Sequence, residues 1–225
     1  QHRIPLQHLL GEADFYGLTL HVNSDVLIPR PEAEHLVDWL LNTWHPQQVQ
    51  PAPLAILELG TGSGAISIAL AKHLPDTTQI TATDISPQAL QTAQNNAQRH
   101  HLAQRITFHQ GDLFEALPSP TPSFDLIVSN PPYIKTDYAP KLSPEVHDHE
   151  PHLALFTPDN QPDFYTRIAH GAPTVLKPNG TVILELDPNC AQDALEAFST
   201  PQYRNVQLHQ DYAQLDRLIT AQLSH

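Results

Sequence analysis

The feature that most constrains the fold of this chain is the alternation of short apolar runs with helix-like segments. Short apolar or β-branched runs bounded by turn residues predict strands, and longer stretches with apolar residues three or four apart predict helices. Strands separated by helices form a parallel sheet whose two faces the helices cover. We therefore predict an α/β fold with strands at residues 54–59, 79–84, 105–109, 124–129 and 181–186, and with helices from 31, over 63–73, 86–100, about 162–176 and about 190–198.

Extended segments flank this alternation at both ends. Residues 14–28 are typical of a short β-hairpin, and the proline-containing segment 51–53 is typical of a linker. Two late strands are predicted near 203–209 and 215–222. Because only a short connection separates these two strands, we expect them to pair antiparallel.

Composition limits the possible functions. The 225 residues suit one domain with a small appendage, and no apolar run is long enough to span a bilayer. The net charge of −13 argues against a broad basic surface for duplex nucleic acid. The single cysteine, Cys190, cannot form an internal disulfide, which favours the cytoplasm. It has no evident activating neighbour, so we expect an inert thiol.

A glycine-rich segment follows the first predicted strand of the sheet. Its sequence, Gly60-Thr61-Gly62-Ser63-Gly64-Ala65, leads directly into a helix. Glycines at alternate positions let the backbone approach a ligand closely at the carboxyl edge of the sheet, where parallel sheets bind ligands. The same letters satisfy the dinucleotide pattern G-x-G-x-x-G/A, so a dinucleotide and another nucleoside cofactor both remain open here.

Acidic residues end the next two strands. Asp84 ends the second strand, where a carboxylate can accept hydrogen bonds from both ribose hydroxyls of a nucleoside. Asp112 follows the third strand and can accept from an exocyclic amine, while Leu113 can pack on a purine face. A helix N-terminal acid and a plain loop are the structural alternatives for these positions.

The fourth strand ends in Asn130-Pro131-Pro132-Tyr133. A residue before proline is held extended, and the prolines offer carbonyl groups but no N–H groups. The side-chain oxygen of Asn130 and a nearby carbonyl can therefore accept both hydrogens of an –NH2 group, with Tyr133 as a flat wall. A redox site has no need for such a pair of acceptors. This segment therefore favours group transfer to a planar nitrogen over dinucleotide chemistry.

Several motifs carry a resemblance to a known family. The segments IPRPEAEHLV (28–37), LELGTGSGAISIALA (57–71), GDLF (111–114), VSNPPYI (128–134) and EPHLAL (150–155) are similar to those of class I S-adenosylmethionine-dependent amino-methyltransferases. More closely, they resemble the bacterial protein-(glutamine-N5) methyltransferases of peptide chain release factors. Departures include Ala33 in place of a threonine and the segment TPDNQPDF at 157–164.

The resemblance implies a seven-stranded Rossmann-like methyltransferase sheet and S-adenosylmethionine as cofactor. The expected cofactor contacts are Gly60, Thr61, Gly62, Ser63, Gly64, Asp84, Asp112, Leu113 and Asn130. The expected glutamine site is Asn130, Pro131, Pro132 and Tyr133, with Asn130, Pro131 and Tyr133 nearest the chemistry. Family members carry an N-terminal helical domain, so residues 1–30 are expected to be a linker and hairpin remnant and residues 31–225 the methyltransferase domain.

The resemblance also implies a substrate and a mechanism. The expected reaction is direct methyl transfer to the glutamine of the Gly-Gly-Gln loop of a release factor, without a general base, by a cytoplasmic monomer that binds neither nucleic acid nor membrane. Methylation of a ribosomal protein glutamine, adenine-N6 methylation of nucleic acid, and a nucleotide-binding module without catalysis are the alternatives.

Two further segments invite other interpretations. HDHEPH at 147–152 has three histidines and two acids, yet its spacing matches no zinc pattern, so we expect a solvated loop and no metal. IPRPE is either a helix start in which Arg30 pairs with a nearby acid, or a segment that shapes the substrate channel.

Overall fold

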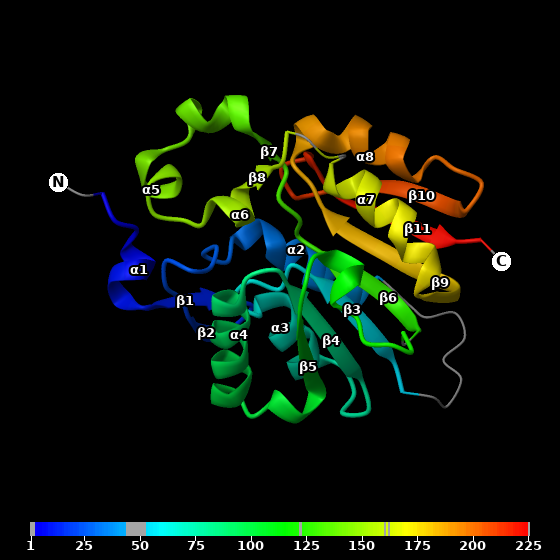
Figure 1. Cartoon of the computed structure of the whole chain (residues 1–225), viewed down its shortest axis with the longest axis horizontal. Coiled ribbons are helices and arrows are strands. Elements are labelled where there is room, and N and C mark those ends of the chain that lie inside the picture. The colour runs from blue at the N-terminus through cyan, green and yellow to red at the C-terminus, as the bar shows by residue number, and fades with distance from the viewer. Residues whose placement is uncertain (1–2, 44–52, 122, 160, 162, 225) are drawn as a thin grey trace.

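The computed structural model describes residues 3–43, 53–121, 123–159, 161 and 163–224. Residues 51 and 52 of the predicted linker lie outside these ranges. A seven-stranded sheet forms the centre of the molecule, in the order β10-β11-β9-β6-β3-β4-β5 (Figure 1). Its strands are β3 (Ala55–Leu59), β4 (Gln79–Asp84), β5 (Ile106–Gln110), β6 (Phe124–Ser129), β9 (Leu176–Glu185), β10 (Tyr203–Gln210) and β11 (Asp216–Leu223).

Strand directions in the sheet follow the connections along the chain. The neighbours β9, β6, β3, β4 and β5 are parallel, because helices or long segments connect them. Strand β11 is antiparallel to both of its neighbours, β10 and β9. The predicted α/β class and the antiparallel pairing of the last two strands are therefore confirmed. The hairpin formed by β10 and β11 folds back so that β11 lies between β9 and β10.

The two faces of the sheet bury different residues of the same strands. Ile56 belongs to a core cluster with the β1–β2 hairpin and helices α2 and α3, whereas the next residue, Leu57, belongs to a second cluster with α7 and α8. This alternation is the two-residue period of a strand. The helices that cover the sheet are α2 (Pro31–Asn42), α3 (Ala65–His73), α4 (Pro87–Arg99), α7 (Phe164–Gly171) and α8 (Ala191–Phe198).

The N-terminal part of the described chain packs into the first of these cores. Strands β1 (Glu12–Phe15) and β2 (Leu18–His21) form an antiparallel hairpin, shorter than the predicted 14–28 segment. Phe15 and Leu20 are buried against Leu36 of α2. The hairpin therefore shares its core with the seven-stranded sheet.

Smaller elements connect the sheet to its surface segments. Strands β7 (Ile134–Lys135) and β8 (Phe156–Thr157) form a short parallel pair that the sequence pattern did not predict. The other short elements are α1 (Leu6–Leu10), α5 (Pro144–His147), α6 (His152–Leu155) and the 3₁₀ turns η1 (Ala103–Arg105), η2 (Leu113–Ala116), η3 (Thr136–Lys141), η4 (Ala172–Thr174) and η5 (Pro188–Cys190).

One predicted helix is wrong in extent. The segment predicted as a helix over about 162–176 is helical only to Gly171, continues as the turn η4, and enters β9 at Leu176. Pro173 lies in η4, and a proline inside a helix removes a main-chain hydrogen bond. Strand β9 accordingly begins five residues before the predicted start at residue 181. None of the described helices has the length and apolar character needed to cross a bilayer.

Candidate active site

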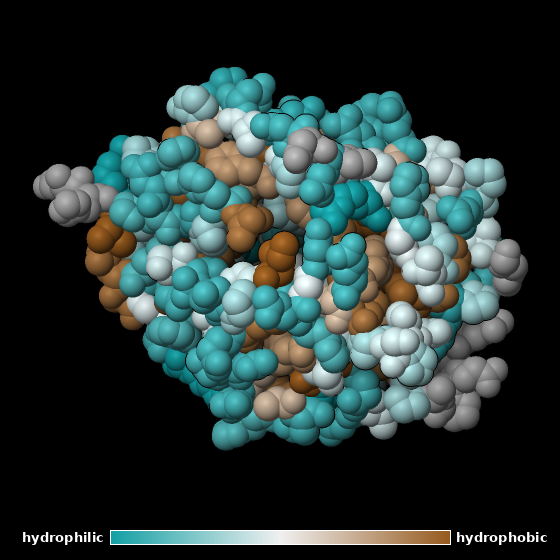
Figure 2. Space-filling view, viewed as in Figure 1, coloured by the Kyte–Doolittle hydropathy of each residue, from teal (hydrophilic) through white to brown (hydrophobic). Residues whose placement is uncertain are grey.

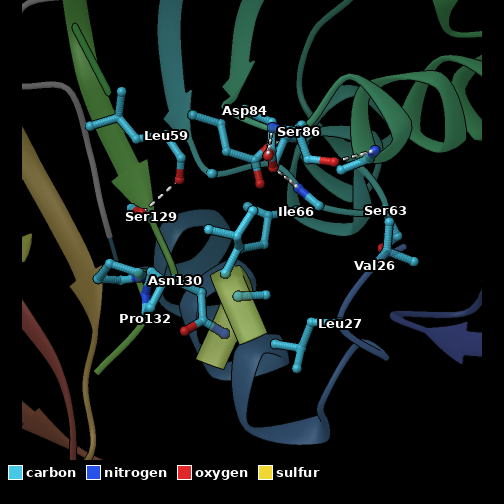
Figure 3. Close-up of a pocket in the computed structure, with 18 of the residues that line it drawn as sticks. Val26, Leu27, Leu59, Ser63, Ile66, Asp84, Ser86, Ser129, Asn130 and Pro132 are labelled. Atoms are coloured by element: carbon cyan, nitrogen blue, oxygen red, sulfur yellow. Dashed lines mark hydrogen bonds between the residues drawn. The ribbon is translucent and has the colours of Figure 1, made fainter. Parts of the chain in front are cut away.

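A cleft lies at the carboxyl ends of β3, β4 and β6, the edge at which parallel sheets bind ligands. In Figure 3, Asp84 and Ser86 lie at one end of this cleft, and Asn130 and Pro132 lie at the other. Figure 2, viewed from the same side as Figure 1, shows apolar side chains around a hollow over α2 and α6. The N-terminal segment contributes part of the wall, including Val26, Leu27, Pro29 and Arg30.

The glycine-rich segment forms one wall of the cleft. Gly60 and Gly62 have φ angles of 70° and 55°, and a Cβ atom built on either would meet nothing within 4 Å. The two glycines therefore leave open space beside the main chain for a ligand. Gly64 has a φ angle of 82°, but its Cβ position is 3.1 Å from the side chains of Ala93 and Ile68. This third glycine lets α3 approach α4 and does not line the cleft.

Asp84 faces the cleft from the end of β4 and is tied to two main-chain groups. Its Oδ2 atom accepts a hydrogen bond from the Gly62 N–H at 2.8 Å, and its Oδ1 atom accepts from the Ser86 N–H at 2.9 Å. Burial raises the pKa of this carboxyl, and these hydrogen bonds oppose the shift. An ionised carboxylate has about four acceptor positions, so each oxygen can still accept one hydrogen bond from a ligand hydroxyl.

Glu58 lines the same cleft and was missed by sequence reasoning. It is 1% exposed, and its Oε2 atom accepts hydrogen bonds from the hydroxyls of Thr61, at 2.6 Å, and of Ser67. Burial raises its pKa to about 7. The signal that could have revealed this residue is a carboxylate within an otherwise apolar strand, which occurs when hydrogen bonds compensate its burial.

The loop after β5 contributes the opposite wall. Leu113 lines the cleft with a φ angle of 49°, an uncommon conformation for a leucine. Asp112 also lines the cleft, but its Oδ2 atom accepts a hydrogen bond from Arg167 at 2.7 Å, which leaves Oδ1 for a ligand. The Arg167 guanidinium lies over the ring of Phe164, which is itself part of the wall.

The Asn130-Pro131-Pro132 segment closes the other end of the cleft. The preceding Ser129 donates a hydrogen bond from Oγ to the main-chain oxygen of Leu59 at 2.7 Å, which fixes the end of β6 against β3. Asn130, Pro131 and Pro132 line the cleft, whereas Tyr133 packs against the second core cluster and is not among the lining residues. The structure therefore brings three of the four residues of this motif to the cleft.

Glu185 lies directly behind Asn130 and was also missed. It ends β9, the strand next to β6, and Asn130 and Glu185 each follow a residue of the last pair between these strands, Ser129 and Leu184. Glu185 is 2% exposed. Burial and the charge of Glu32 raise its pKa to about 8, although Arg217 and a hydrogen bond from Asn130 lower it.

An ion pair joins the two segments beside the cleft mouth. The Arg30 guanidinium lies 2.5 Å from the Glu150 carboxylate, and Ile28 N–H donates to the same carboxylate at 3.2 Å. Arg30 therefore both pairs with an acid and lines the cleft. Glu150 is 3% exposed, so the expectation of a solvated loop at 147–152 is wrong at this residue.

Two other predicted features take no part in the cleft. Among the residues that the structure describes, no group of histidine, cysteine and acidic side chains is arranged to hold a metal ion. Burial and the charge of Asp187 raise the pKa of the Cys190 thiol to about 11. A thiol with this pKa is a poor nucleophile near neutral pH.

Comparison with known proteins identifies the family of the chain. Residues 52–218 match the model of a methyltransferase domain. A release factor glutamine methyltransferase from Geobacter sulfurreducens is 41% identical over 217 residues, which cover 96% of this chain and 72% of the relative. A protein of the same name from Bacteroides thetaiotaomicron is 39% identical over 218 residues, which cover 96% of this chain and 75% of the relative.

The chain belongs to the release factor glutamine methyltransferase family. This confirms the resemblance drawn from the IPRPE, GTGSG and NPPY segments. Solved methyltransferases share the fold of this family member at low identity. One from Pyrococcus furiosus has a TM-score of 0.65 at 18% identity and covers 93% of this chain and 90% of that chain. A Thermus thermophilus 16S rRNA methyltransferase with AdoMet and guanosine has a TM-score of 0.66 at 19% identity, over 94% of this chain and 49% of that chain.

Proposed function

We propose that this family member transfers a methyl group from S-adenosylmethionine to the side-chain amide nitrogen of the glutamine in the Gly-Gly-Gln loop of a peptide chain release factor. Such a reaction would take place in the cytoplasm and modulate translation termination. The observation that carries the proposal is Asn130, an amide acceptor held at the cleft between a strand end and two prolines, in a chain whose relatives are named release factor glutamine methyltransferases.

The cofactor would lie along the carboxyl edge of the sheet. The open space beside Gly60 and Gly62 would accommodate its amino acid part, with Thr61 and Ser63 in the same wall. The Asp84 carboxylate would accept hydrogen bonds from the ribose hydroxyls, and Leu113 would pack on the adenine. The free Oδ1 atom of Asp112 would accept from the adenine amine. Bound there, S-adenosylmethionine supplies a methyl group made electrophilic by its sulfonium.

The chain itself prepares the glutamine nitrogen. An amide nitrogen is a poor nucleophile because its lone pair is delocalised into the carbonyl group. The Asn130 side-chain oxygen and a carbonyl of the proline segment would accept its two hydrogens, which aims the lone pair at the methyl group. The cofactor would supply the methyl group, and its sulfur would retain the electrons of the carbon–sulfur bond that is exchanged for the new nitrogen–carbon bond. One proton then leaves the nitrogen to water, so no side chain is needed as a base.

Mass spectrometry tests the proposal directly. The protein is incubated with S-adenosylmethionine and, separately, a release factor, a ribosomal protein preparation and DNA. We expect the mass gain of a single methyl group on the glutamine of the Gly-Gly-Gln loop. Methyl incorporation only into the ribosomal protein or only into DNA contradicts the proposed substrate, and no incorporation into any of them contradicts the proposed activity.

A further inference from the structure

We infer that the turn between β10 and β11 docks the body of the protein substrate, and that it binds a positively charged, partly apolar patch beside the target glutamine. This turn surface consists of Tyr212 and Leu215, with the acidic residues Glu32 and Asp187 next to them. The inference rests on the proposed function, because it assigns the part of the molecule that holds the substrate while one glutamine enters the cleft.

The order of the strands places the turn surface on the substrate side of the cleft. The cleft extends along the sheet from Asp84, after β4, to Asn130, after β6, and the next strands in the same direction are β9 and β11. Strand β11 is antiparallel to β9, and its residue Leu218 pairs with Glu185 at the end of β9. The turn that precedes β11 therefore lies at the carboxyl edge of the sheet, beyond Asn130 and away from the wall at Asp84.

Large apolar side chains are exposed at this edge. Tyr212 is 88% exposed and Leu215 is 44% exposed, and Leu153, which lines the cleft, is 67% exposed. Among the described residues, the other exposed large hydrophobic side chains lie in or just before α1, or in the connections that follow β4 and β6. The described parts of the helices that cover the sheet expose none. Apolar side chains exposed on one side of a protein indicate contact with another macromolecule.

Hydrogen bonds hold the turn in one conformation. The Asp211 carboxylate accepts from the main-chain N–H groups of Ala213, at 2.8 Å, and Leu215, at 3.0 Å. The same carboxylate accepts from the guanidinium of Arg217 at 2.9 Å, and the Asp211 N–H donates to the main-chain oxygen of Leu215 at 2.9 Å. A side chain on a fixed turn loses less conformational entropy on binding, and tyrosines are among the residues that contribute most to protein interfaces.

Helix α2 connects the turn surface to the cleft. The centroids of the Tyr212 and His35 rings are 5.0 Å apart, and His35 belongs to α2. Arg30 and Ala33, at the N-terminal end of the same helix, line the cleft. Residues 30 and 35 are separated by only about 8 Å along the helix axis. A protein with a glutamine in the cleft can therefore also contact Tyr212.

The charge of the turn surface indicates the charge of its partner. Glu32 is exposed and lies three residues before His35, on the same face of α2. Asp187 lies beside the start of β11, because the N–H of the preceding residue donates to the main-chain oxygen of Arg217 at 2.9 Å. Arg217 already forms an ion pair with Asp211. The remaining carboxylates make this surface negative, in a chain whose net charge is −13, so a complementary partner surface is positive.

Calorimetry with a release factor, in the presence of S-adenosylhomocysteine, tests the inference. Tyr212→Ala should weaken binding of the release factor by roughly 5–30-fold, the range expected for truncation of an interface anchor. Tyr212→Phe keeps the ring and should retain most of the affinity. The single-turnover rate at saturating release factor should not change in Tyr212→Ala, because the turn lies away from the reacting atoms. Its thermal unfolding midpoint should also stay the same, because the side chain is 88% exposed.

Ionic strength provides a second test. The association rate constant for the release factor should fall as salt rises from about 50 to 300 mM, because salt screens the attraction between opposite charges. Glu32→Gln should lower this rate constant at low salt and weaken its salt dependence. Glu196→Gln removes an exposed charge of α8 and is the matched control, with little effect expected. An association rate constant that does not depend on salt would overturn the assignment of a positively charged partner surface.

Unchanged affinity in Tyr212→Ala overturns the inference, as does a loss of the maximal rate without a loss of affinity. Self-association of the chain that Tyr212→Ala abolishes, seen by analytical ultracentrifugation, also overturns it, because the turn surface would then bind a second copy. An unchanged protein that binds the release factor through Tyr212 but does not methylate it contradicts the proposed function and supports the docking surface. Methylation with equal affinities in Tyr212→Ala and the unchanged protein contradicts only the docking surface.

Discussion

The carboxylate of Glu150 accepts hydrogen bonds from the guanidinium of Arg30, at 2.5 Å, and from the main chain of Ile28, at 3.2 Å. Glu150 is buried, whereas the Arg30 side chain is 33% exposed. The contact joins residues 120 positions apart in the chain. Both Arg30 and the neighbouring Pro151 line the cleft, so this pair holds together the two segments that form its mouth.

Breaking this pair should destabilise the protein and loosen the mouth of the cleft. Loss of one partner of a buried pair costs about 3–5 kcal/mol, and the partial exposure of Arg30 reduces this to roughly 1–3 kcal/mol for Glu150→Gln. Denaturant unfolding gives the change in the free energy of unfolding. Glu145→Gln removes the exposed pair with Arg3 and serves as control, with no measurable change expected. Equal stability losses for both variants would contradict the assignment.

Asp84→Ala should weaken cofactor binding more than turnover at saturation. Two hydrogen bonds to a charged group, each worth about 1.5–3 kcal/mol, predict a loss of affinity of roughly 10²–10⁴-fold. Calorimetry with S-adenosylmethionine measures the affinity. The Gly62 and Ser86 N–H groups lose their acceptor in this variant, so Asp84→Asn, which retains one oxygen, is measured beside it. Unchanged affinity in both variants would remove Asp84 from the cofactor site.

Alanine substitutions at Gly62 and Gly64 should differ in their effects on cofactor affinity and on protein stability. Gly62→Ala puts a methyl group into open space of the cleft, so it should weaken cofactor binding, with a backbone strain of roughly 1–2 kcal/mol at its positive φ. Gly64→Ala has similar strain and adds contacts at 3.1 Å with Ala93 and Ile68, so it should lose more stability. Thermal unfolding and calorimetry on both variants are the measurements. A more stable Gly64→Ala than Gly62→Ala would contradict this division.

Asn130→Ala should slow the chemical step. The variant removes the acceptor proposed for the substrate NH2 group, and loss of one positioned hydrogen-bonding group costs about 10²–10³-fold in rate. Single-turnover methylation of a release factor with saturating cofactor measures this step without product release. A rate equal to that of the unchanged protein would show that Asn130 does not take part in the reaction.

Buried carboxyls should make stability fall as pH rises from about 5 to 8. Burial raises the pKa of Glu58 to about 7 and that of Glu185 to about 8, from a usual value of 4.5. Between pH 4.5 and the raised pKa of each carboxyl, the folded protein retains a proton that the unfolded chain has lost. The free energy of unfolding therefore decreases as the pH rises. Glu185→Gln should flatten this dependence in denaturant unfolding. A stability that rises over this interval would contradict the assignment.

Local sequence patterns were sufficient to predict the seven strands of the central sheet, apart from the start of β9, and most of the residues proposed to hold the cofactor. The strand end at Asp84, the turn at Gly60 and Gly62 and the break at Asn130 depend on residues that are neighbours in the sequence, and these residues line the cleft as expected, whereas Gly64 does not. The end of α7 was missed because apolar residues three or four positions apart continue from residue 164 through the turn η4 and into β9. Periodicity alone does not separate these conformations.

Contacts between distant segments could not be predicted in this way. Glu58 and Glu185 lie in apolar runs, and only the sheet order shows that their strands, β3 and β9, both flank β6, the strand that leads to Asn130. The pairing of β6 with β9 sets the end of β9, where Glu185 lies, beside the end of β6, and no local sequence signal encodes this pairing. Arg167 likewise reaches Asp112 from α7, which leaves only part of that carboxylate for a ligand.

The long separation between Arg30 and Glu150 also sets an order of assembly. The hydrogen bond between Asp84 and Gly62 closes a loop of 22 residues, whereas the Arg30–Glu150 pair closes one of 120. Closure of the longer loop loses more chain entropy, by about 1.5 kcal/mol on a logarithmic dependence on loop length. The wall of the cleft at Gly62 and Asp84 can therefore form early, between residues that are close in the sequence, while the mouth of the cleft is completed only when the two distant segments have packed together.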